Sequence, residues 1–168
     1  MNRASGLPAP TSRAPGPSAR RVVVLDTSPL SRLTERPGKS QEVIDCHTWF
    51  EGLQRAGFPV CLPEIADYEL RRELLRAGQR ASITRLDELQ QRTHYLPITT
   101  SVMRLAAAFW ATARNLGRPT ARDESLDADV ILAAQALSIG TPNVVIATSN
   151  PGHLARYVDA LPWREIPT

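Results

Sequence analysis

Residues 21–28 read RVVVLDTS, an apolar run that stops abruptly at a carboxylate and two hydroxyls. Uninterrupted apolar runs of this length are typical of strands buried on both faces inside a parallel sheet. Ligands of such sheets bind beyond the carboxyl ends of the strands, because loops and helix N-termini converge there. The segment therefore predicts a buried parallel strand that presents Asp26 at a ligand-binding edge.

Strands and helices alternate along the rest of the chain. Helical patterns occupy about 40–56, 63–78, 83–90, 101–115 and 125–138. Further strands are expected at 60–62, 95–99, 144–147 and 163–166. Pro97 argues that its strand lies at a sheet edge. The alternation predicts an α/β fold, a three-layer α/β/α sandwich with a mostly parallel sheet of four or five strands and right-handed crossovers.

The composition fits one domain preceded by a tail. The chain has 168 residues, 42% apolar and 22% charged, as expected of a single compact domain. Residues 1–20 hold four prolines among Ala, Ser and Gly, which predicts a disordered tail before a folded domain at 21–168. No apolar run is long enough for a membrane span or a secretory signal, so a cytoplasmic protein is expected. Cys46 and Cys61 form no CxxC pair and are expected to be buried thiols.

The basic residues exclude some phosphate-binding motifs. The formal net charge is +3, and Lys39 is the only lysine. A P-loop needs a glycine-rich turn between a strand and its lysine, which Lys39 lacks, and no GxGxxG follows the first strand. Arginine suits phosphate oxygens, but the charge alone indicates nucleic-acid binding only weakly.

Acidic side chains recur at positions that can meet at one edge of the predicted sheet. Asp26 follows the first strand, and Glu69 lies among apolar positions of its helix rather than on a clean polar face. Asp127 and Asp129 stand near the start of a helix that is apolar nearly all round. The alternative roles are structural: helix caps for the aspartates, and a surface ion pair with a nearby arginine for Glu69.

The two aspartates of the last helix compete for one role. Residues two apart on a helix point about 200° apart, so both cannot face one site unless one precedes the regular turns. We take Asp129 as the first choice and Asp127 as the second. With Asp26 and Glu69, either would form an oxygen-only negative cluster, which favours Mg²⁺ or Mn²⁺ over zinc. A bound cation can activate water against a phosphodiester, so the sequence predicts a metal-dependent nuclease.

In this order, the segments resemble a PIN domain, and in particular the VapC-like toxins of bacterial toxin-antitoxin pairs. The matching segments are VVLDTS at 23–28, EL at 69–70, LDADVILAA at 126–134 and VIATSN at 145–150. The resemblance implies a Mg²⁺-dependent endoribonuclease acting on RNA, frequent homodimerisation and a separately encoded antitoxin. It also implies that Asp26, Glu69 and Asp127 or Asp129 bind the metal.

One position departs from the PIN pattern, which usually has a fourth acid after the threonine of the last matching strand. This chain has Asn150 there, and an amide oxygen can coordinate but brings no charge. The alternative function is therefore a catalytically weakened PIN-like module that binds RNA or a partner protein without cleaving. A haloacid-dehalogenase-like phosphatase is disfavoured, because it would need an acid where Ser28 stands.

Several other side chains have possible roles around an RNA. His153 lies three residues past Asn150 and can touch phosphate, although a surface or capping role is more common for such a histidine. The tryptophans can stack on bases, but their settings favour core or dimer-interface roles. These are Trp49, Trp110 and Trp163. The alanine-rich helix at 101–115 offers a plausible dimer interface.

Overall fold

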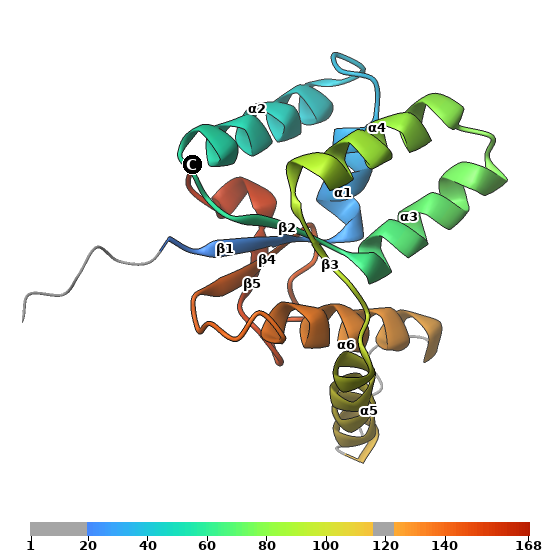
Figure 1. The fold of residues 1–168 in the computed structure, drawn as a ribbon, viewed down its shortest axis with the longest axis vertical. Helices are drawn as coiled ribbons and strands as arrows, with labels where there is room; N and C mark the ends of the chain where they lie inside the picture. The colour runs from blue at the N-terminus through green and yellow to red at the C-terminus, as the bar shows by residue number, and fades with distance from the viewer. Residues whose placement is uncertain (1–19, 116–122) are drawn as a thin grey trace, which may run out of the picture.

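A computed structural model describes residues 20–115 and 123–168 of the chain (Figure 1). The predicted tail falls almost entirely on residues 1–19, which lie outside the described residues. Residues 116–122, between the predicted helices at 101–115 and 125–138, lie outside them as well.

Five strands form one sheet in which every neighbouring pair is parallel, with the order β3-β2-β1-β4-β5. The strands are β1 (Val22–Leu25), β2 (Val60–Pro63), β3 (His94–Leu96), β4 (Val144–Thr148) and β5 (Ala160–Pro162). The predicted strand at the start of the domain is the central one, and β3 is at an edge, as Pro97 predicted, although it ends one residue before that proline.

Six helices in the described residues cover the two faces of this sheet. They are α1 (Thr27–Thr34), α2 (Gln41–Arg55), α3 (Glu64–Arg76), α4 (Arg80–Arg92), α5 (Thr100–Asn115) and α6 (Asp123–Leu137). Figure 1 shows α1 to α4 on one side, and α6 with α5 beyond it on the other. The predicted three-layer α/β/α sandwich is therefore confirmed. The short helix α1 had no predicted counterpart, because only a cap at Asp26 was expected there.

Alternate side chains of the strands enter two separate cores. In β1, Val23 and Leu25 pack into the core beneath α1 to α4, while Val24 packs into the core that α6 closes. All three are fully buried. A strand buried on both faces has little choice but to be apolar throughout, which explains the run that opens the domain.

The last predicted strand is wrong. The sequence favoured a strand at 163–166, whereas β5 ends at Pro162 and Trp163–Glu165 form a 3-10 helix. Trp163 packs on Trp49 with 5.5 Å between ring centroids, and the Trp49 Nε1–H donates to the Ile166 carbonyl over 3.1 Å. Trp163 thus packs onto α2, and its segment does not join the sheet. Four residues are too few for the sequence pattern to distinguish a short strand from a 3-10 helix.

Two other predictions concern burial. Cys46 and Cys61 are free and buried, as predicted. Among the helices of the described residues, none is long and apolar enough to cross a membrane.

Candidate active site

Asp26 is fixed at the carboxyl end of β1 by three donors. Its Oδ1 accepts a hydrogen bond from the Thr27 backbone N–H at 2.7 Å, and its Oδ2 accepts from the Thr148 hydroxyl at 2.6 Å and from the Ser28 hydroxyl at 3.5 Å. The contact with Thr148 follows from the register, because β1 and β4 pair Leu25 with Ala147 and the next residues meet. Burial raises the pKa of Asp26, and these hydrogen bonds partly offset that effect. The carboxylate also caps α1, so the capping role and a site role coincide.

Glu69 approaches the same edge from α3. The Thr27 hydroxyl donates to Glu69 Oε2 over 2.9 Å, so one residue contacts both Asp26 and Glu69. Arg76, which the sequence offered as a surface partner of Glu69, instead pairs with Glu73 at 2.8 Å. Glu69 is therefore half-buried and turned toward α1 rather than toward the helix surface.

Asp129 lies in the electrostatic field of the other two acids. The helix α6 begins at Asp123, so both Asp127 and Asp129 fall within regular turns and point in different directions. Burial raises the pKa of Asp129 to about 6; His153 and Arg156 oppose this rise, whereas Asp26 and Glu69 add to it. The register left open by the sequence therefore favours Asp129 as the neighbour of Asp26 and Glu69.

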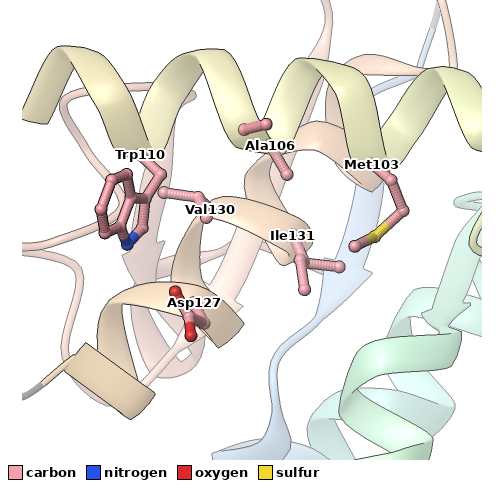
Figure 2. Close-up of a pocket in the computed structure, with 7 residues that line it drawn as sticks. Met103, Ala106, Trp110, Asp127, Val130 and Ile131 are labelled. Carbon is pink, nitrogen blue, oxygen red and sulfur yellow. The ribbon is translucent and has the colours of Figure 1, made fainter.

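Asp127 faces a different part of the surface. It is exposed and lines two hollows, one of about 310 Å³ beside Glu69 and one of about 340 Å³ between α5 and α6. Figure 2 shows the second hollow, with Trp110 of α5 extending toward Asp127 of α6. Asp127 is thus adjacent to the acidic site without the burial that Asp129 has.

Asn150 follows β4 at the same edge and has an exposed side chain. Its backbone N–H donates to the Thr148 hydroxyl oxygen over 3.0 Å, and that hydroxyl in turn donates to Asp26. Thr148, whose relative exposure is 1%, and Thr27 are the site residues that sequence reasoning missed as contacts of the acids. The sequence signal available for them was a threonine at the carboxyl end of each of two neighbouring strands. Thr27 stands two residues after β1, and Thr148 is the last residue of β4.

The donor set fits a hard divalent cation in its chemistry. Asp26, Glu69 and Asp129 offer only carboxylate oxygens, which Mg²⁺ and Mn²⁺ prefer, and a cation would relieve the raised pKa of the two aspartates. As the side chains stand, no three His, Cys, Asp or Glu residues within 20–115 and 123–168 are grouped closely enough to hold a metal ion. Asp26 and Glu69 accept hydrogen bonds from threonine hydroxyls instead.

A family model of the PIN domain matches residues 23–158. The chain belongs to the PIN domain family. PIN domains are generally nucleases, and the match spans β1, α3, α6 and β4, the elements that carry the acidic site. The resemblance noted from the sequence is therefore confirmed at the level of the family.

Solved structures share the fold of this PIN domain. A chain in the crystal structure of VapBC2 from Rickettsia felis, bound to a DNA fragment from the promoter, matches with a TM-score of 0.64 and 12% identity, covering 83% of this chain and 97% of that one. FitAcB from Neisseria gonorrhoeae matches with a TM-score of 0.60 and 21% identity, covering 86% and 99%. VapBC-1 from nontypeable Haemophilus influenzae matches with a TM-score of 0.61 and 20% identity, again covering 86% and 99%. No curated protein sequence matches this PIN domain.

Proposed function

We propose that this PIN domain, spanning residues 21–168, is a metal-dependent endoribonuclease and the toxin of a toxin-antitoxin pair. The observation that carries the proposal is that the charges of Asp26 and Glu69 both raise the pKa of Asp129, so the three acids lie near one another. Asp26 directly follows β1, Glu69 lies on α3 and Asp129 lies on α6. Such a cluster is unfavourable without a cation, because burial and like charge both oppose ionisation.

The proposed chemistry is hydrolysis of an RNA phosphodiester. A bound Mg²⁺ or Mn²⁺ supplies activation of water and neutralises charge on the phosphate oxygens. Asp26 and Glu69 would act as ligands whose orientation depends on Thr27 and Thr148. Asp129 would complete the ligand set.

Positive charge near Asp129 supports a phosphate ligand at this edge. His153 and Arg156 both act on Asp129 in the direction that favours its charged form. The Arg156 guanidinium also offsets the negative charge that a phosphate would meet as it approaches three carboxylates. Arginine also suits phosphate oxygens geometrically.

Cleavage of total RNA and transfer RNA by the purified protein tests the proposal, with Mg²⁺, Mn²⁺ or EDTA added. We expect metal-dependent cleavage that is lost in Asp26→Asn and Asp129→Asn. Asp45→Asn, on α2 and outside the site, is the matched control and should cleave normally. Asp127→Asn should reduce cleavage less than Asp129→Asn does. Full activity in a folded Asp26→Asn protein would contradict the assignment.

The second candidate is a PIN module that binds RNA or a partner protein without cleaving. The exposed Asn150 favours it, because an amide stands where the family pattern has an acid. RNA binding without cleavage under any metal would select this reading. Asn150→Asp then provides a sharp test, since a restored carboxylate should increase metal affinity and cleavage if the missing charge is the cause.

The proposal also includes partners and a location for the protein. The structural neighbours named VapBC2 and VapBC-1 support a separately encoded antitoxin partner, and we retain the expected homodimer and cytoplasmic location. Growth arrest on expression, relieved by the product of an adjacent gene, would support the toxin assignment. Light scattering of the purified chain would determine its oligomeric state.

A further inference from the structure

We propose that Tyr68 and Trp110 form a base-stacking track for single-stranded RNA beside the acidic site. This inference rests on the proposed ribonuclease function and deepens it, because it assigns two side chains outside the acidic cluster to binding of the substrate.

Tyr68 and Trp110 are unusual in their exposure. Among the Phe, Tyr and Trp side chains of the described residues, these two are the most open to solvent, at 57% and 38%. By contrast, Trp49 and Trp163 are buried in the core. Trp110 therefore has no core role, and a contact between copies or a contact with RNA are the two roles left for it.

Each of the two exposed rings carries an arginine. The Arg72 guanidinium carbon lies 5.4 Å from the Tyr68 ring centroid, and that of Arg114 lies 4.9 Å from the Trp110 centroid. Aromatic rings beside cationic groups are the recurrent elements of single-strand binding, because a base stacks on the ring while the cation attracts the backbone.

The two rings belong to hollows that meet. The hollow at Tyr68 has a volume of about 310 Å³ and the one at Trp110 about 340 Å³, and both are lined by Asp127 and Ile131. Figure 2 shows the hollow at Trp110, with Trp110 on α5 and the two shared residues Asp127 and Ile131 on α6. The hollow at Tyr68 also reaches Glu69. A strand lying along this surface would therefore pass from the acidic site over Asp127 to Trp110.

The residues that line the two hollows favour unpaired RNA over a protein as the ligand. Ile131 and Ala128 offer apolar contact to base faces, and the Asp127 carboxylate can accept hydrogen bonds from amino groups on base edges. In a duplex the base faces are stacked on one another, so only unpaired nucleotides can use both rings. A surface that buries a second protein copy would not be expected to place a carboxylate between its two aromatic anchors.

Binding of a short single-stranded RNA containing 2-aminopurine tests the track without requiring cleavage. The parent protein is Asp26→Asn, titrated in the presence of Mg²⁺, and fluorescence quenching reports stacking of the modified base. We expect Tyr68→Ala and Trp110→Ala each to weaken affinity by about 5- to 150-fold, the range of one lost base–aromatic stack, and to reduce the quenching. Tyr68→Phe should retain both affinity and quenching, because the ring remains.

Leu75→Ala is the matched control. Leu75 is 63% exposed on the same helix as Tyr68, two turns further along, and outside both hollows, so its loss should leave affinity unchanged. A duplex of the same sequence should bind more weakly and should not distinguish the variants.

Three outcomes would overturn the inference: no binding of single-stranded RNA by the parent, unchanged affinity in both alanine variants, or an equal loss for duplex RNA. Conversion of a dimer to a monomer by Trp110→Ala, with RNA affinity retained, would identify the groove as a contact between copies. Absence of cleavage by the wild-type protein would contradict the proposed ribonuclease. The binding experiment does not depend on cleavage, so its result would still support or overturn the stacking track.

Discussion

The Thr27 hydroxyl donates a hydrogen bond to Glu69 Oε2 over 2.9 Å, and the backbone N–H of the same residue donates to Asp26 Oδ1 over 2.7 Å. One threonine therefore orients two carboxylates that arrive on different elements. The Thr27–Glu69 contact joins residues that are 42 positions apart in the sequence. Thr27 begins α1, which lies on the same side of the sheet as α3. The contact therefore explains how Glu69 of α3 reaches the end of β1.

Thr27→Val removes this hydroxyl at nearly constant volume. We expect the free energy of unfolding to fall by about 1 kcal/mol and cleavage to fall by about 10- to 100-fold, because Glu69 loses its fixed orientation. Thr27→Ser should retain most of both. Urea unfolding and initial cleavage rates measure the two effects, and a fully active Thr27→Val protein would show that Glu69 needs no such support.

Asp26 should separate stability from activity. Asparagine caps helices as well as aspartate does, so Asp26→Asn should unfold at the same or a higher temperature at neutral pH, since it also removes a buried charge. Asp26→Ala loses the cap and should be less stable than the wild type by about 1 kcal/mol. Neither variant should cleave. Thermal unfolding beside cleavage assays tests this, and similar destabilisation in both variants would argue against the capping role.

Asp129 should make the metal-free protein less stable as pH rises. Its pKa in the folded protein is raised from 3.8 to about 6, so the folded state binds a proton more tightly than the unfolded state does. The contribution of this proton to the free energy of unfolding is fully present below about pH 4 and is lost as pH rises through about 6. Asp129→Asn should therefore gain stability relative to the wild type as pH rises from about 4 to 7. A constant difference in unfolding temperature over that range would contradict the shift.

Much of the fold and part of the site could be predicted because both depend on local pattern. An apolar run ending at Asp26 identifies the central strand and the sheet edge at which Asp26 lies. The sequence favoured Asp129 over Asp127 but left both open, because the choice depends on where α6 begins and which face it buries. The roles of Thr27 and Thr148 depend on contacts between distant segments, since their hydroxyls meet Glu69 and Asp26 only after the sheet and helices assemble.

The two cysteines should be unreactive in the folded protein. Burial raises the pKa of Cys46 to about 12 and that of Cys61 to about 11, so almost no thiolate is present at pH 8. Ellman's reagent should modify neither thiol in the native state and both in urea. Because the folded-state pKa values are raised above 9.0, this contribution to stability should be lost as pH rises above about 9. Rapid native-state modification of Cys61 would indicate that α6 opens from the sheet.

Gln135 should be the most sensitive polar residue of the core. It is fully buried on α6, where its Oε1 accepts from the Ile65 N–H over 3.2 Å and its amide donates to the Leu96 carbonyl over 2.5 Å. The cap position Pro63 has no side-chain capping bond, so Gln135 supplies a partner for the start of α3 from another helix. It thereby fixes the helix that carries Glu69.

Gln135→Leu leaves the Ile65 N–H and the Leu96 carbonyl without these partners. Each unsatisfied buried group costs about 1–3 kcal/mol, so the variant should lose the sum of two such terms. Gln91→Leu, exposed on α4, is the control and should change stability by less than about 0.5 kcal/mol. Urea unfolding compares the two. Equal stability would mean that water satisfies both groups, and Gln135 would then have no part in placing Glu69.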